Sequence, residues 1–168
     1  MTLSEALLPE FDQEMATTRR FLLRVPEQKF GWKPHEKSGT MGWLAGHLAR
    51  LPEWAVITIR DTGWDMAPNG VPNELPPLPK SSQEILEWFD GNVHDARAAI
   101  CGATDLDLAG PWSLLHNRKV MFTMPRSVCL RIWVMNHLVH HRAQLGVYLR
   151  LNNIPVPATY GPSADEAE

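Results

Sequence analysis

Two histidines, His137 and His141, lie four residues apart in a stretch whose other periodic positions are apolar. In an α-helix this spacing places both imidazoles on one face, about 40° apart around the axis. Val134, Leu138 and Leu145 share that face. Two imidazoles on an apolar face are costly unless both are bonded. A divalent cation would take one nitrogen of each ring and leave the other N–H for a protein acceptor, so the pair predicts a metal site.

A third ligand has to come from another part of the chain, because two protein ligands rarely hold a metal. His47 is the candidate, since it lies between Leu44 and Leu48 in a second apolar stretch. For His47 taken alone, a core histidine with an ordinary hydrogen-bond partner is the competing interpretation. His140 competes with its two neighbours, because an i, i+3 pair can also chelate, but it lies toward the edge of the stripe. We expect the other histidines to be solvated, namely His35, His94 and His116.

The histidine motif lacks the carboxylates of two common metalloenzyme patterns. Leu138 follows His137, so the HExxH motif of metalloproteases, whose glutamate is the general base, is absent. No carboxylate lies between His137 and His141, which also excludes the Glu-x-x-His pattern of di-iron bundles. The sequence therefore predicts ligands, but it identifies no general base.

Composition and charge restrict the class of protein. The 168 residues are 44% hydrophobic and 21% charged, which is ordinary for a soluble chain that buries a core without disulfides. A net charge of -3 argues against a nucleic-acid-binding domain. We find no apolar run of about 18 residues for a membrane span and no secretion signal in Met1–Pro9. Cys101 and Cys129 stand outside any CxxC motif, so we expect two buried, reduced thiols in a cytoplasmic protein.

Prolines and apolar periodicity locate the elements that must position the histidines. Helical spacing of apolar residues predicts helices at about 3–24, 40–60, 81–102 and 126–151. Ser81 and Glu84 have the spacing of a capping box for the third helix. Pro52 lies inside the second helix, where it removes a hydrogen bond to the Leu48 carbonyl and should kink the helix.

The connections predict how these helices are arranged. Five prolines between Gly63 and Lys80 exclude a regular helix or inner strand, and so long a link lets the second and third helices run parallel. Before the fourth helix, two apolar runs flank the polar turn His116–Lys119, which predicts a small hairpin. We therefore expect an all-α four-helix bundle in one domain, residues 1–168, whose irregular tail at 152–168 ends in a frayed acidic segment.

The tryptophans divide into two groups. Those in predicted elements are expected to be core or interface anchors, namely Trp43, Trp54, Trp88, Trp112 and Trp133. Trp32 and Trp64 fall in predicted loops, where they could lie near an opening or a dimer face.

Three segments resemble the DinB-like (YfiT-type) family of bacterial four-helix proteins. Asn136–Leu145 reads NHLVHHRAQL and resembles the family's fourth-helix motif, while Trp43–Ala49 resembles its second-helix motif. The tail Pro155–Asp165 is similar to the ending of one subgroup. This resemblance covers nearly the whole chain. It implies a homodimer with a three-histidine divalent metal site, zinc or nickel held by His47, His137 and His141, and water in the open positions.

The resemblance also implies a reaction class, because characterised members of the family include thiol-cofactor-dependent S-transferases and isomerases. We accordingly expect a metal-dependent enzyme with a small-molecule substrate and a low-molecular-weight thiol as cosubstrate. The alternatives are a metal-dependent hydrolase and a non-enzymatic, stress-related protein with a structural or ligand-sensing metal, which a closed four-ligand shell would favour. Gln144 could support a ligand or simply lie on the polar surface, and Tyr160 could cover the pocket or only pack.

Overall fold

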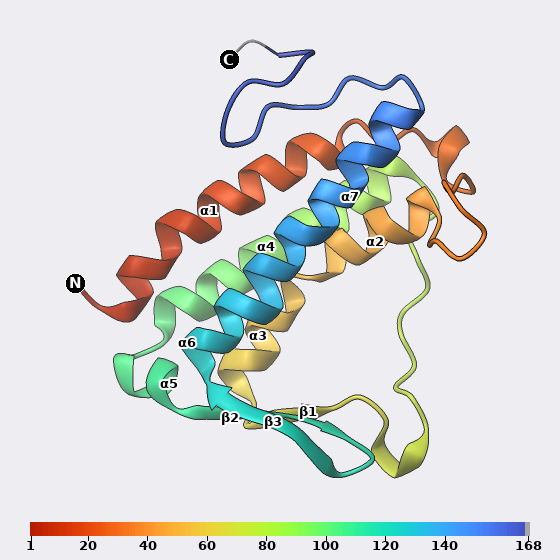
Figure 1. Ribbon diagram of the computed structural model, residues 1–168. Coiled ribbons are helices and arrows are strands. Elements are labelled where there is room, and N and C mark those ends of the chain that lie inside the picture. Colours follow the sequence, from red (N-terminus) through yellow and green to blue (C-terminus); the bar gives the residue numbers. More distant parts are fainter. Residues whose placement is uncertain (167–168) are drawn as a thin grey trace.

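The computed structural model describes residues 1–166, and four long helical segments make up most of it (Figure 1). They are α1 (Leu3–Leu22), α2 (Met41–Arg50) with α3 (Glu53–Arg60), α4 (Ser82–Gly102), and the continuous segment from α6 (Arg126–Cys129) to α7 (His137–Leu151). Shorter elements are two 3₁₀ turns, Glu27–Lys29 and Pro68–Gly70, and the helix α5 (Asp105–Ala109), which was not predicted from the sequence. Among these residues, no helix has the length and apolar character that crossing a membrane requires.

The long proline-rich link has the predicted effect on topology. In Figure 1 the chain leaves α3 at one end of the bundle and returns through this link to the other end, where α4 begins. Helices α2 and α3 therefore run in the same direction as α4, and α1 and α7 run in the opposite direction (Figure 1). This arrangement places α2 beside α7, so the two helices that carry the candidate ligands are neighbours.

Hydrogen bonds from side chains set the helix starts. Thr2 and Glu5 form a capping box at α1, in which the Thr2 hydroxyl accepts from the Glu5 amide at 3.2 Å. Ser81 caps α4 by accepting from the Glu84 amide at 3.1 Å. The predicted capping box at α4 is only half formed, because the Glu84 carboxylate accepts from the Lys80 amide at 2.8 Å instead.

The single helix predicted at 40–60 is two helices, because Pro52 does more than kink it. Pro52 has no N–H to donate. At the break the backbone hydrogen bonds join residues three apart: the Trp54 amide donates to the Leu51 carbonyl at 3.1 Å and the Ala55 amide to the Pro52 carbonyl at 3.0 Å. His47 consequently lies in the last turn of α2, and Trp54 lies in the first turn of α3.

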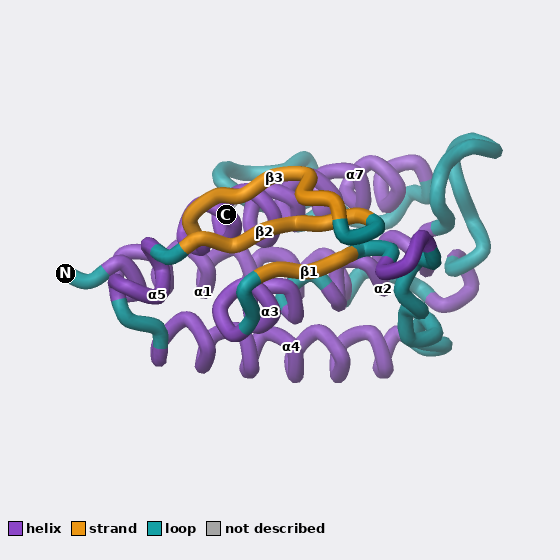
Figure 2. Tube along the Cα trace, turned by 90° about the horizontal axis from the view of Figure 1, so that it is seen from below, coloured by secondary structure: helices purple, strands orange, loops and turns teal. Residues whose placement is uncertain are grey.

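The expectation of an all-α fold needs correction: the fold is helix-rich, but a three-stranded sheet lies across one end of the bundle (Figure 2). Its strands are β1 (Gly63–Asp65), β2 (Pro111–His116) and β3 (Lys119–Pro125). The antiparallel pair β2–β3 confirms the predicted hairpin, and β1 adds to it in parallel, with Gly63 opposite Ser113. A Cβ at Gly63 would lie 2.5 Å from the Ser113 carbonyl oxygen, so this pairing requires glycine.

Apolar side chains from all four helical segments fill one main core, and a smaller cluster lies beneath the sheet. The main core includes Phe11, Leu44, Leu48, Phe89 and Leu138, all of which are fully buried. Cys129 is buried in the smaller cluster, as predicted, and both cysteines are free thiols. The prediction for Cys101 is wrong, because its position near the end of α4 faces solvent.

The tail after α7 folds back along α1 and α7 rather than fraying (Figure 1). The Asp165 carboxylate pairs with Arg150 at 2.5 Å and accepts from the Val156 amide at 2.8 Å. Glu166 pairs with Arg24 at 3.0 Å. The predicted fraying is therefore wrong as far as Glu166, and residues 167–168 lie outside the described residues.

Candidate metal centre

Helices α2 and α7 bring the three candidate histidines together. His47 Nε2 lies 3.3 Å from His137 Nε2, which in turn lies 2.8 Å from His141 Nε2. One ring nitrogen from each histidine lies within 4.8 Å of the other two. Zinc–imidazole bonds of about 2.0–2.1 Å place two ligand nitrogens about 3.3 Å apart around a tetrahedral ion. The donor atoms and their spacing therefore fit a divalent metal held by His47, His137 and His141.

A widened helical turn precedes the first of the two ligands on α7. Residues Leu130–Asn136 form a π-helix, in which hydrogen bonds join residues five apart, and the α-helix resumes at His137. The extra residue per turn rotates the helix face before the π stretch relative to the face after it. The Trp133 backbone in this turn raises the pKa of His137, against the larger effect of burial. Such π turns occur frequently at functional sites.

Gln144 orients the second ligand on α7. His141 Nδ1 lies 2.7 Å from Gln144 Oε1, and because an amide oxygen only accepts, Nδ1 carries the proton. His141 Nε2 is thereby left unprotonated, and it faces His137 Nε2 at 2.8 Å. The amide nitrogen of Gln144 lies 3.1 Å from His140 Nε2, so His140 is the outer member of this chain. Gln144 is thus an exposed residue, as one of its two options has it, and it also contacts the candidate ligand His141, as the other requires.

Burial and mutual repulsion keep the three imidazoles uncharged at neutral pH. Burial is the largest cause for His47, and the nearby His141 adds to it, so the pKa of His47 is lowered to about 4. Burial and His141 also lower the pKa of His137 to about 4. For His141, burial lowers the pKa against an opposing hydrogen bond to Gln144. Neutral imidazole is the form that binds metals, so these rings are in their ligating state at neutral pH.

Indole rings surround the three histidines. The Trp43 ring stacks on His47 with centroids 5.1 Å apart, and Trp54 meets His137 edge-on at 5.6 Å. Trp43 was expected to be a core or interface anchor, but 43% of it is exposed and it borders the centre. Trp64, expected in a loop, lies in β1 and packs against Trp54 at 5.8 Å. The ligand group is thus set in an apolar, aromatic rim.

The remaining sequence candidates do not join the centre. His35, His94, His116 and His140 are all exposed, as expected for the first three. Across residues 1–166, the metal-ligating group contains three histidines and neither a carboxylate nor a thiolate. The three histidines are half-buried at the edge of the bundle, and not in its apolar core as their apolar neighbours had indicated.

Comparison with known proteins places the chain in a family. The model of the DinB superfamily matches residues 10–145, a span that contains all three histidines. The chain belongs to the DinB superfamily. The uncharacterized protein YrdA of Bacillus subtilis (strain 168) is 24% identical over 159 residues, which cover 95% of this chain and 89% of YrdA.

Two crystal structures of DinB-like proteins share the fold. The protein from Bacillus cereus ATCC 10987 superposes with a TM-score of 0.71 at 21% identity, covering 93% of this chain and 97% of that one. YjoA from Bacillus subtilis superposes with a TM-score of 0.70 at 15% identity, covering 92% and 97%. At these identities the likeness shows the DinB-like fold alone, so the function has to be argued from the site.

Proposed function

We propose that this DinB superfamily protein is a divalent-metal-dependent enzyme, an S-transferase or isomerase that uses a low-molecular-weight thiol as cosubstrate. The observation that carries the proposal is a donor set of three neutral imidazoles to which no fourth protein ligand is added within residues 1–166. Catalytic zinc sites commonly have three protein ligands and an open position, whereas structural sites have four. The donor set therefore supports an enzyme over a structural metal.

The chemistry follows from the charges at the centre. Three neutral ligands leave the positive charge of the ion uncompensated, which favours an anionic fourth partner. A divalent ion held there, zinc or nickel, would lower the pKa of a thiol and hold the thiolate as a nucleophile. In a transfer, the sulfur forms a bond to carbon as the bond to the leaving group breaks, and the thiol proton leaves to solvent.

The residues around the ligands have separate tasks in this proposal. Gln144 holds His141 in the tautomer that ligates. Trp43 and Trp54 form an apolar wall beside the reacting position, which limits water and gives a small electrophilic substrate a surface to pack on. A hydrolase at the same centre would use a general base, and the absence of a carboxylate from the described ligand group makes thiol chemistry the better fit.

The first test is of metal binding. Protein purified without a histidine tag should carry close to one first-row divalent metal per chain by elemental analysis. His137→Ala should lose that metal, because His137 Nε2 lies between the other two ligand nitrogens. His94→Ala is the matched control, since His94 is exposed on α4 and should keep full occupancy. No metal in the wild type, or the same content in His137→Ala, would refute the proposal.

The second test is of the reaction. A panel of low-molecular-weight thiols is incubated with electrophilic substrates, and consumption of thiol is followed with and without the protein. Turnover should disappear in His141→Ala and after chelation, and should return when zinc or nickel is added back to the wild type only. Thiol consumption that persists in His141→Ala would exclude this centre as its origin. The homodimer implied by the family resemblance stays a prediction, which sedimentation equilibrium can check.

A further inference from the structure

A second group of buried polar side chains lies directly beside the metal centre in sequence. Arg142, the residue after His141, is 2% exposed, and its Nη1 lies 2.6 Å from Glu14 Oε2 of α1 in an ion pair. The same nitrogen donates to the Glu14 carbonyl at 3.2 Å and to the Thr18 hydroxyl at 3.3 Å. These contacts join the ligand-bearing helix α7 to α1.

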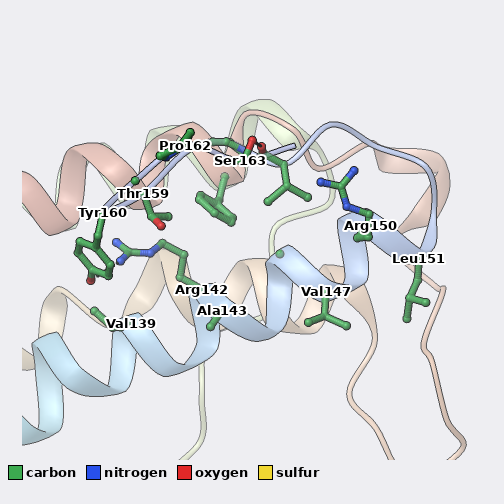
Figure 3. A pocket seen from close by; sticks show the side chains of 15 residues that line it. Val139, Arg142, Ala143, Val147, Arg150, Leu151, Thr159, Tyr160, Pro162 and Ser163 are labelled. Atoms are coloured by element: carbon green, nitrogen blue, oxygen red, sulfur yellow. Dashed lines mark hydrogen bonds between the residues drawn. The ribbon is translucent and has the colours of Figure 1, made fainter. Parts of the chain in front are cut away.

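Tyr160 of the tail completes this group, which we call the Glu14–Arg142–Tyr160 network. Its hydroxyl accepts from Arg142 Nη2 at 2.7 Å and donates to Glu14 Oε1 at 2.8 Å. Burial and the bond to Glu14 raise the pKa of Tyr160, so the hydroxyl stays protonated and keeps that donor. Figure 3 shows the guanidinium of Arg142 pointing toward Tyr160, with the tail passing above α7.

The tail reaches the network across a cavity. A space of about 440 Å³ lies between α7 and the tail, and Arg142, Gly146 and Tyr160 are among its lining residues (Figure 3). Tyr160 as a whole is 70% exposed, although its hydroxyl reaches the buried ion pair. The tail therefore does more than cover an apolar surface, because it contacts the network through specific hydrogen bonds.

The energetics of buried ion pairs suggest what such a network does. Removing two charges from water costs several kcal/mol, and well-packed apolar side chains of similar volume often replace a buried pair without loss of stability. The best-attested gain from a buried polar group is the choice of one packing register over others. Here the register concerned is that of α7 against α1, since the network links Arg142 of one to Glu14 of the other.

The close packing of the two helices makes that register consequential. A Cβ at Gly146, one turn beyond Arg142, would lie 3.1 Å from the Phe21 ring of α1, so the helices approach closely there. Because His141 and Arg142 are adjacent, a slide or rotation of α7 that breaks the ion pair also moves the His141 ring. The ligand nitrogens tolerate little movement, since they are spaced at about the distance that one ion requires.

We propose that Tyr160, through Arg142 and Glu14, is a positioning residue for the metal centre: the docked tail holds α7 in the register that places His141 against His47. This inference rests on the proposed function only where it says that the register of α7 affects metal binding at the three histidines. The fixing of α7 by the tail is a separate claim and can be measured without metal.

The experiment compares three variants with the wild type. Tyr160→Phe removes the bridging hydroxyl and keeps the ring. Combining it with Glu14→Leu and Arg142→Met replaces the whole network with apolar groups of similar size. Val147→Ala is the matched control, because Val147 lies on α7 and lines the same cavity but is 58% exposed and makes no network contact. Zinc affinity is measured by chelator competition, Co²⁺ coordination by its absorption spectrum, and folding by thermal unfolding.

We expect Tyr160→Phe to lower zinc affinity about tenfold, at the lower end of what outer partners of a metal site contribute. The triple variant should unfold at or above the wild-type temperature and yet bind zinc at least tenfold more weakly, with an altered Co²⁺ spectrum. A merely structural network would leave zinc affinity and the Co²⁺ spectrum unchanged in the apolar variant. Wild-type affinity and spectrum in both Tyr160→Phe and the triple variant would overturn the proposal.

Amide hydrogen exchange without metal separates this inference from the proposed function. If the wild type binds no zinc, the proposed function fails, but the claim about α7 is still decided. Amides of residues 141–145 should exchange at least tenfold faster in Tyr160→Phe than in Val147→Ala. Faster exchange confined to the tail, with α7 unchanged, would show that the tail docks without fixing the helix and would overturn the inference.

Discussion

His141 and Arg142 are consecutive residues of α7, and they use their polar groups in opposite ways. The Arg142 guanidinium is buried and has protein partners on α1 and on the tail. The His141 ring is half-buried, and its Nε2 faces two other imidazole nitrogens that carry no opposite charge. A group whose partners are all protein atoms is explained by the fold, whereas three imidazole nitrogens that face one another could together hold a cation.

Whether the polar groups have oppositely charged protein partners distinguishes a structural polar cluster from a candidate ligand site, whatever the residue types. The Glu14–Arg142–Tyr160 network contains a cation, an anion and a hydroxyl: the hydroxyl bonds to both charged groups, and Glu14 Oε2 has the charge of Arg142 beside it but no hydrogen bond of its own. The three-histidine group contains only neutral rings, whose charging burial opposes. A cation could bind to the second group, whereas Arg142 would repel a cation from the first. The two clusters should therefore respond differently to mutation.

The largest effect is expected on the metal-free protein. Arg142→Met should lower the free energy of unfolding by about 3–5 kcal/mol, because it leaves Glu14 buried beside no opposite charge. His141→Ala should cost less than about 1 kcal/mol. The ring is half-buried, and its nitrogens contact only Gln144 and the neutral imidazole of His137. Urea denaturation in the presence of a chelator measures both values.

A compensating variant sharpens this contrast. Adding Glu14→Leu to Arg142→Met removes the stranded carboxylate, and most of the lost stability should return. If Arg142→Met costs no more than His141→Ala, then the two clusters do not differ as we describe and the network contributes nothing that the fold needs.

The sequence could predict the parts of this molecule that depend on local signals. The four helical segments follow from apolar periodicity, and the hairpin from two apolar runs around a polar turn. The group of three histidines was predicted because His137 and His141 fall on one helix face and because His47 has apolar neighbours; that they bind a metal stays a prediction. These features need only a few consecutive residues to be recognised.

The parts that the sequence missed depend on distant partners. Strand β1 has only three residues, Gly63–Asp65, and exists because β2 pairs with it from about fifty positions away. The hydrogen bonds from Arg142 and from Tyr160 to Glu14 span 128 and 146 positions, so no local sequence pattern could predict the network. Helix α5 has five residues, which is too short for a periodicity. Exposure of Cys101 likewise depends on which face of α4 meets its neighbours.

A smaller effect is expected at Gln144, and it belongs to the metal centre alone. Gln144→Ala removes the acceptor that fixes the His141 tautomer, so metal affinity should fall about 10- to 100-fold. Because Gln144 is exposed, the free energy of unfolding without metal should change little. Zinc competition with a chelator measures the first quantity and urea denaturation the second.

Gln144→Glu is the matched control, since a carboxylate keeps an acceptor within reach of His141 Nδ1 and should retain most of the affinity. A loss of stability in Gln144→Ala that matches its loss of affinity would place Gln144 with the structural cluster instead. Unchanged affinity in the alanine variant would show that His141 needs no orienting partner.

The smallest effect concerns a half-buried charge that, like Arg142, has protein partners. Asp65 of β1 accepts from the backbone amides of Arg118 at 2.7 Å and of Asn117 at 3.0 Å, the two residues of the hairpin turn. Both turn residues have positive φ, 51° at Asn117 and 64° at Arg118, a conformation that disfavours non-glycine residues. The Asp65 carboxylate thus compensates for the turn that joins β2 to β3, and it ties the turn to β1.

The pH dependence tests this role. Burial opposes ionisation of Asp65, but the amide hydrogen bonds outweigh it and lower the pKa below 3.8. A lowered folded-state pKa means that the carboxylate stabilises the fold above its unfolded-state pKa, and that this contribution is lost as the pH falls through the folded-state value. The urea midpoint of Asp65→Asn should therefore lie below that of the wild type at pH 7, and the two should converge as the pH falls through the lowered pKa of Asp65. A difference that stays constant between pH 7 and pH 3 would show that the side-chain shape, and not its charge, supports the turn.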